Sequence, residues 1–154
     1  MFTDEVRRLI DGSVLCWLAT SSAAGEPSVS PKEIFTAFGD RAIIIANIAS
    51  PGSGRNIREN PRACVSFIDI FRQKGFQVKG GAVELRAGDE HFSEAEAALT
   101  AMTQGLFPFK SLFMVTAETI EPIVAPRYRL FPDTAEADQI HAAMASYGVR
   151  PIAD

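Results

Sequence analysis

Apolar residues along this chain fall into short continuous runs, a few stretches of helical spacing, and little else. Strands are predicted where the runs are bounded by turn residues, at 13–20, 27–38, 42–46, 63–71, 76–85 and 112–124. The 42–46 run has no polar position, which predicts a strand buried on both faces. Pro31 interrupts the second strand, which indicates a bend, a bulge or an unpaired edge. Gly80 and Gly81 within the fifth strand indicate a bulge or a close backbone approach.

Helical spacing of apolar residues predicts four helices, at about 3–11, 54–60, 89–104 and 134–147. Residues 127–129, between two prolines, are expected to be extended. The strands are joined by short turns and do not alternate regularly with helices, which favours an antiparallel sheet over a doubly wound one. Closing six strands removes exposed edges, so we predict a mainly β fold over 1–154, a single-domain six-stranded antiparallel barrel with peripheral helices.

Composition excludes some functions. The net charge of −4 argues against a general nucleic-acid binder. No segment approaches the ~20 apolar residues of a membrane span, and the first residues are acidic where a signal peptide is basic, so we expect a cytoplasmic protein with no membrane contact. Cys16 and Cys64 lie inside strand-like runs, and His91 and His141 lie alone in polar helices. No metal site is predicted from this pattern.

The segment 47–61 concentrates the candidate chemistry. It places Ser50, Ser53 and Arg55 among glycines and a proline, between a buried strand and a helix start. Unpaired N–H groups and the helix dipole favour an anion at a helix start, and the arginine fork matches phosphate. The segment therefore suggests a phosphate cradle. On the turn alone, a capped surface turn with solvated arginines is favoured, because such turns are common, and the segment matches neither a P-loop nor a Gly-x-Gly-x-x-Gly fingerprint.

Five blocks in succession resemble the pyridoxamine 5'-phosphate oxidase-like FMN-binding split barrels, over about residues 6–125. The blocks are 14–20, 25–32, 44–47, 55–67 and 79–84. No single block is specific, but their order and spacing are. The most telling part is Ile57-x-x-Asn60-Pro61-Arg62, which is followed by a strand. The resemblance implies a six-stranded split β-barrel that forms a homodimer, with FMN at the subunit interface.

The resemblance also implies site residues. The phosphate candidates, with Lys74 added as a further basic residue, are Ser50, Ser53, Arg55, Asn56 and Lys74. The candidates for contact with the ring system are Ser30, Pro31, Lys32, Glu33, Ile34, Ala46 and Asn47. A lysine near the flavin ring would raise the reduction potential. Without the resemblance, Lys32 would be interpreted as a solvated lysine, and Arg55 as a surface arginine paired with Glu59. Trp17 is expected in the core. Phe107 and Phe109 are expected either to line the substrate side or to seal the dimer interface, and the dimer interface is favoured.

The chain departs from true pyridoxamine phosphate oxidases, because residues 28–32 lack the Arg-x-x-x-x-Lys motif and the last ten residues lack Arg-x-His. Vitamin B6 activity is therefore not expected. The predicted function is an FMN-dependent oxidoreductase acting on an unidentified small molecule, with no catalytic residue assigned because the flavin itself transfers hydride. The alternatives are a flavin-binding or redox-sensing module without turnover, and a deazaflavin F420-binding reductase. Haem is not expected, because His91 or His141 would have to supply an axial ligand.

Overall fold

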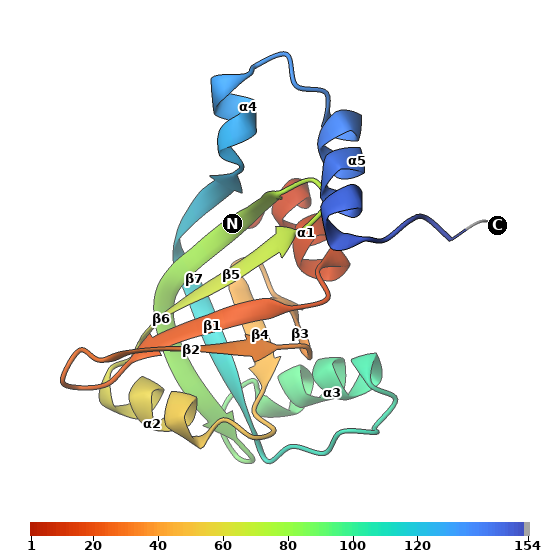
Figure 1. Ribbon diagram of the computed structural model, residues 1–154. Coiled ribbons are helices and arrows are strands. Elements are labelled where there is room, and N and C mark those ends of the chain that lie inside the picture. Colours follow the sequence, from red (N-terminus) through yellow and green to blue (C-terminus); the bar gives the residue numbers. More distant parts are fainter. Residues whose placement is uncertain (153–154) are drawn as a thin grey trace.

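The strands form one antiparallel sheet in the order β2-β1-β5-β6-β7-β4-β3, curled into a half-barrel (Figure 1). This computed structural model describes residues 1–152. The strands are β1 (Cys16–Ser21), β2 (Pro27–Lys32), β3 (Phe35–Phe38), β4 (Ala42–Ala46), β5 (Arg62–Asp69), β6 (Lys74–Arg86) and β7 (Ser111–Val124). The helices are α1 (Asp4–Gly12), α2 (Pro51–Glu59), α3 (Phe92–Met102), α4 (Pro126–Leu130) and α5 (Glu136–Tyr147). The antiparallel half-barrel with peripheral helices confirms the predicted fold class.

The connection between β2 and β3 explains why the sheet curls. These strands are consecutive in the chain and separated by only Glu33 and Ile34, yet they occupy the two opposite edges of the sheet. A two-residue link can join opposite edges only if the sheet bends round until the edges meet. The N–H of Ala46 on β4 donates to the carbonyl of Ile34 at 3.0 Å, which ties the link to the sheet. We call this closure the seam.

The prediction of one strand over 27–38 was wrong, and the seam is the reason. The chain leaves one edge of the sheet at Lys32 and enters the other at Phe35, which makes seven strands instead of six. Pro31 stands on an edge strand, as its missing N–H suggested. The hydrophobic pattern of these residues fits a strand throughout, so the change of edge leaves no mark in it.

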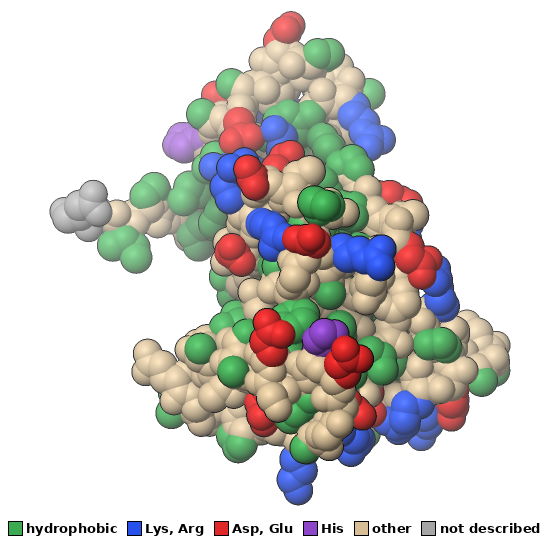
Figure 2. All heavy atoms as spheres, turned by 180° about the vertical axis from the view of Figure 1, so that it is seen from behind, with side chains coloured by type: hydrophobic (Ala, Val, Ile, Leu, Met, Phe, Trp, Pro, Cys, Tyr) green, Lys and Arg blue, Asp and Glu red, His purple; other side chains and the backbone are tan. Residues whose placement is uncertain are grey.

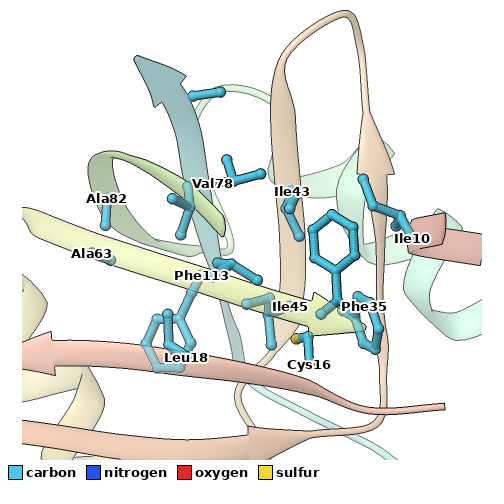
Figure 3. Packing of buried hydrophobic residues seen from close by; sticks show 14 of the residues in the cluster. Ile10, Cys16, Leu18, Phe35, Ile43, Ile45, Ala63, Val78, Ala82 and Phe113 are labelled. Atoms are coloured by element: carbon cyan, nitrogen blue, oxygen red, sulfur yellow. The ribbon is translucent and has the colours of Figure 1, made fainter. Parts of the chain in front are cut away.

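The core has two parts, one on each side of β4. Ile43 and Ile45 point into the barrel, where they meet side chains from β1, β3 and β7 (Figure 3). Ile44 and Ala46 point outward and pack against α3 and the start of β7. Successive side chains alternate between the faces of a strand, so this helix-covered outer face confirms that β4 is buried on both sides.

Two predictions need correction, one on where a helix begins and one on a segment that was expected to be extended. The helix after β4 begins at Pro51 and not at residue 54, because Pro51 is preorganised for a first helical position and the Ser/Gly run continues into the helix. Residues 127–129 are not extended; they lie in α4, which likewise starts with a proline. Both errors come from interpreting glycine and proline as loop residues, whereas Pro51 and Pro126 each stand at the start of a helix.

The helices gather at the two ends of the sheet. α2 and α3 lie at one end, whereas α4 and α5 lie at the other (Figure 1). The face in Figure 2 carries acidic and basic side chains interspersed, not gathered into one patch. Among residues 1–152, no helix is long and apolar enough to cross a membrane. The same described residues contain no cluster of three or more potential metal ligands.

Candidate functional site

A cavity of about 340 Å³ opens at the seam, and most of the predicted ring-contact residues line it. Its lining consists of Leu15, residues 30–34, Ala46, residues 48–50 and Phe107. We call it the seam cavity. The structure thus brings together Ser30, Pro31, Lys32, Glu33, Ile34 and Ala46, and adds Ser50 from the start of α2. These residues meet because β2 and β4, which are not paired in the sheet, come together where it closes.

Lys32 is the most unusual residue of the seam cavity, because its side chain is buried without an acidic partner. The residue is 8% exposed, and its Nζ donates to Ser50 Oγ. No carboxylate lies within ion-pair distance of it among the described residues. Burial lowers the pKa of Lys32 below its ordinary value. The protein therefore keeps a poorly solvated cation, with one hydroxyl for a partner, at the wall of a cavity.

Cys16 lies directly across from Lys32 on the neighbouring strand. It is fully buried, and burial raises the pKa of its thiol to about 12, although the charge of Lys32 acts in the opposite direction. The thiol is therefore protonated at neutral pH and does not neutralise the lysine.

Asn47 connects the seam to the end of β6. Its Oδ1 accepts the N–H of Ser50 at 3.2 Å, and its Nδ2 lies 3.1 Å from Glu84 Oε1 and 3.0 Å from Ser111 Oγ. These bonds fix the 47–50 segment that carries Ser50 to Lys32. Asn47 does not line the seam cavity, so its predicted contact with the ring system stays a prediction.

Glu84 is the centre of a second polar cluster. Its side chain is 3% exposed and accepts hydrogen bonds from Asn47, Ser111 at 2.8 Å, Arg86 at 3.0 Å and Arg58. Burial alone would raise the pKa of this carboxyl, but the bonds from Ser111, Arg58 and Arg86 outweigh burial and lower it. Glu84 is therefore ionised at neutral pH.

A second cavity, of about 280 Å³, lies beside this cluster. Its lining consists of residues 47–51, Gly54, Arg58, Glu84, Arg86, Lys110 and Ser111. We call it the basic cavity. It shares residues 48–50 with the seam cavity, so that segment separates the two. Gly54 allows α2 to approach closely here, because a Cβ on it would lie 3.2 Å from Arg58 Nη1 and 3.4 Å from Glu84 Oε2.

The remaining phosphate candidates occupy different sides of α2. Ser53 and Asn56 are buried against the barrel, and Asn56 Nδ2 donates to Thr20 Oγ1 at 3.0 Å, which holds the helix on β1. Arg55 is exposed on the outer side and is not paired with Glu59. Neither cavity is lined by Ser53, Arg55 or Asn56, so their contact with a phosphate stays a prediction.

Lys74 lies apart from the other candidates. It begins β6, whereas Glu84 lies ten residues further along the same strand, or about 30 Å of extended chain. Its Nζ is 2.9 Å from Glu136 of α5 and 4.6 Å from the ring centre of Tyr128. Within one protomer, Lys74 therefore anchors the C-terminal helices instead of lining the seam cavity.

Sequence reasoning missed several residues near the site. Trp17 was expected to lie in the core, but its side chain is on the outer face of β1 and the residue is 43% exposed. Phe107, for which the substrate side was one of two expectations, reaches the seam cavity from the loop after α3. Arg58 was expected to be solvated, but it pairs with Glu84, 26 positions further along the chain. Only the apolar run around Trp17 gave a local signal, and it could not tell which face of β1 is covered.

Glu84 should make stability depend on pH in the acid range. Because the folded pKa lies below the unfolded value near 4.5, its contribution is present above that value and is lost as pH falls through the folded pKa. We expect Glu84→Gln to lower the free energy of unfolding at neutral pH by about 1–2 kcal/mol. We also expect a flatter decline of that free energy as pH falls below 4.5, as measured by urea unfolding.

Glu118→Gln is the matched control, because Glu118 pairs with Arg62 at 2.5 Å on the surface, with a side chain that is 51% exposed. Its effect should be smaller and should disappear at high salt. If the free energy of unfolding declines with falling pH in Glu84→Gln as it does in the unmodified protein, the cluster does not hold the carboxylate in its ionised form.

Comparisons with known proteins agree with the fold. The family model described as pyridoxamine 5'-phosphate oxidase matches residues 2–123. HupZ from Group A Streptococcus is similar in structure, with 26% identity, a TM-score of 0.67, and coverage of 78% of this chain and 92% of that one. An FMN-binding protein from Syntrophomonas wolfei has 20% identity, a TM-score of 0.66, and coverage of 79% and 86%.

Other structures with this fold are described with different cofactors. They are a FAD-binding protein from Mesorhizobium loti, an F420 reductase, and HutZ, the heme storage protein from Vibrio cholerae, each below 20% identity. No curated protein matches the chain. The family match covers more than three quarters of the 154 residues, including six strands in full and all but the last residue of β7, and the curled sheet has the neighbours' fold, so this chain belongs to the pyridoxamine 5'-phosphate oxidase family.

Proposed function

We propose that this protein binds FMN as a homodimer, with the flavin ring in the seam cavity, and acts as an oxidoreductase on a small molecule. The observation that carries the proposal is Lys32. Among the described residues, the only polar partner of this buried lysine is the hydroxyl of Ser50. Such a lysine is costly in an empty protein, and a bound group that carries negative charge or carbonyl oxygens would compensate for that cost.

The start of α2 supports a phosphate position next to this cavity. Ser50 is the N-cap residue, but its side chain makes no capping bond, since its hydroxyl accepts from Lys32. The N–H groups in the first turn of a helix have no acceptor within the helix, and they attract anions. Arg55, one turn further on, is exposed and able to reach a phosphate from the solvent side.

The size and surroundings of the seam cavity support a dimer. Its volume of about 340 Å³ is near the low end for small-molecule sites, which usually bury most of their ligand. Trp17 lies opposite Pro31 in the β1–β2 register, and Val29, 61% exposed, shares their face. A second copy packed on this apolar face would supply the missing wall and cover exposed side chains beside the cavity.

FMN, once bound, would supply hydride transfer, which the protein side chains do not need to perform. The chain's own role is to hold the ring at the seam and to place the charge of Lys32 beside it. A positive charge there favours the form of a bound group that carries more negative charge. His91 and His141 line neither cavity, which favours FMN over haem.

A titration with FMN tests the proposal. We expect the purified protein to take up FMN with a shift of the flavin absorbance, and the flavin to bleach when NADH or NADPH is added without oxygen. Arg55→Ala should weaken FMN binding about tenfold but leave riboflavin binding unchanged, because riboflavin has no phosphate.

Arg8→Ala, which removes an exposed arginine on α1, is the control and should change neither affinity. If the protein takes up no FMN at saturating concentrations of the flavin, the proposal is overturned. If the protein takes up flavin but NADH and NADPH do not bleach it, the protein is a flavin-binding module and the proposed oxidoreductase function is wrong.

A further inference from the structure

Lys32 differs from the other three lysines of the chain in its surroundings. Two of them, Lys74 and Lys79, are paired with carboxylates, and the hydrogen bonds to these carboxylates raise the pKa of both amines. The third, Lys110, is exposed to solvent. Lys32 is the buried lysine, and burial disfavours the charged form of its amine. The fold therefore makes this amine the most readily deprotonated of those paired or buried.

The groups around the Lys32 amine do not neutralise its charge. Its Nζ donates to Ser50 Oγ and lies 6.0 Å from the ring centre of Phe113. Two titratable residues flank it. The thiol of Cys16 on β1 is protonated at neutral pH, and Glu33 lines the same cavity without forming an ion pair with the amine. An amine in such surroundings is a nucleophile, because desolvation frees its electron pair from a proton.

The seam cavity limits which molecules can reach this amine. Its volume is about 340 Å³, and apolar residues form most of its wall. Three of them, Leu15, Ile48 and Phe107, are also exposed to solvent, so apolar side chains stand where a ligand enters. A small planar molecule with little charge fits this lining better than a strongly charged one. Aromatic aldehydes combine that shape with a carbonyl group that reacts with amines.

We propose that the seam cavity, when it holds no flavin, captures a small aromatic aldehyde by forming an imine with Lys32. The uncharged amine attacks the carbonyl carbon, and the π electrons of the carbonyl bond move to its oxygen. Ser50, whose hydroxyl accepts from Nζ, is placed to pass one amine proton to that oxygen. The hydroxyl group then leaves with the remaining N–H proton as water. Amine and aldehyde thus give imine and water, and no oxidant or reductant is consumed.

Reductive trapping on the full chain without flavin tests the inference. Benzaldehyde with cyanoborohydride converts each imine into a stable benzylamine, and peptide mapping by mass spectrometry locates the label. At neutral pH we expect on the order of tenfold more label on Lys32 than on the exposed Lys110. The excess should shrink as pH approaches 10.5, the ordinary pKa of a lysine, because exposed lysines then lose their proton as well. The α-amine of Met1 also reacts, but it lies in a separate peptide.

Two variants check the position of the label. Lys32→Met should lose the preferred label, whereas Lys110→Met, the control, should keep it. Equal labelling of Lys32 and Lys110 at neutral pH would overturn the inference, because the cavity would then give the amine no special reactivity. Absence of label on Lys32 would overturn it too.

Saturation with FMN separates this inference from the proposed flavin site, on which the capture does not depend. Loss of the Lys32 label when FMN is bound, with the Lys110 label unchanged, supports one cavity shared by the two ligands. A Lys32 label that persists with FMN bound would support the capture and contradict the placement of the flavin ring. Preferred labelling of Lys32 in a protein that never binds FMN would likewise support the capture and overturn the flavin function.

Discussion

Replacing Lys32 by methionine is expected to weaken FMN binding by about a hundredfold, or about 2.7 kcal/mol, while making the protein without ligand more stable. Lys32 is 8% exposed, lines the seam cavity and donates to Ser50 Oγ, so it is placed to bond an acceptor on a bound ring. Without ligand, the same charge is poorly solvated. Methionine has a similar length and removes that cost.

The opposite signs of the two effects make the variant informative. A lysine that only supported the fold would lower both stability and affinity when it is replaced. We expect an increase of about 1 kcal/mol in the unfolding free energy without ligand, which corresponds to ~2–4 °C in Tm for a chain of this size. FMN titration by fluorescence and thermal unfolding by circular dichroism measure the two quantities on the same samples.

The pH dependence provides an independent check. Because the folded pKa of Lys32 lies below its ordinary value of 10.5, the folded state binds fewer protons than the unfolded state between these two values. Stability should therefore rise with pH across that interval, and Lys32→Met should lose this rise. Lys79→Met, which removes a surface lysine paired with Glu121, should change neither FMN binding nor stability by more than a few tenths of a kcal/mol. An unchanged FMN affinity in Lys32→Met would show that Lys32 does not contact bound FMN.

The sequence predicted the features that depend on local pattern. The apolar run of β4 and the turns between strands follow from side-chain alternation and turn residues, and both are found. At Gly80 the backbone of β6 comes close to β7, and the register irregularity opposite it leaves the extra residue, Glu118, on β7. The sequence did not reveal the jump between sheet edges at Glu33 and Ile34, because edge and central strands have the same alternation. Strand order is set by contacts between distant segments, which a local pattern does not record.

The candidate site was predicted unevenly for the same reason. Residues 30–34 were placed through the resemblance, and they do gather at one cavity. The cluster around Glu84 was missed, because it joins Asn47, Arg58 and Ser111 from three segments, each of which looks like ordinary polar surface by itself. Lys74, by contrast, lies apart from the other candidates within one protomer. Its charge fitted an anion site, but strand length places it at the far end of β6.

Gly80→Ala is expected to cause the largest loss of stability of any single methyl group added to this chain near the site. A Cβ on Gly80 would lie 1.9 Å from the carbonyl oxygen of Thr116 and 2.9 Å from its carbonyl carbon, both backbone atoms of β7. Backbone in the middle of a paired strand cannot move aside as a side chain can. We expect a loss of about 3 kcal/mol or more in the free energy of unfolding, measured with urea.

The adjacent glycine gives a matched control. A Cβ on Gly81 would meet only the side-chain Oε1 of Glu118 at 3.8 Å, which is ordinary contact. Gly81→Ala should therefore cause no loss of stability. Alanine restricts the unfolded chain more than glycine does, which favours the folded state by ~0.4–1 kcal/mol. Similar urea midpoints for the two variants would contradict the close approach of β6 to β7 at Gly80.

The effect of Gly80→Ala should extend to the site, because the bulge, which leaves Glu118 of β7 unpaired, sets the register between the end of β6 and the start of β7. The register with β7 shifts by one residue between Lys79 and Gly80, and Glu84 follows four positions later. A one-residue change of register turns every later side chain to the other face of the strand. If the variant keeps its fold by losing the bulge, Glu84 would leave Asn47 and Ser111. The segment that carries Ser50 to Lys32 would then lose its anchor, so FMN affinity should fall in Gly80→Ala and stay unchanged in Gly81→Ala. Equal FMN affinity in both variants, with Gly80→Ala destabilised, would show that the site does not depend on the bulge.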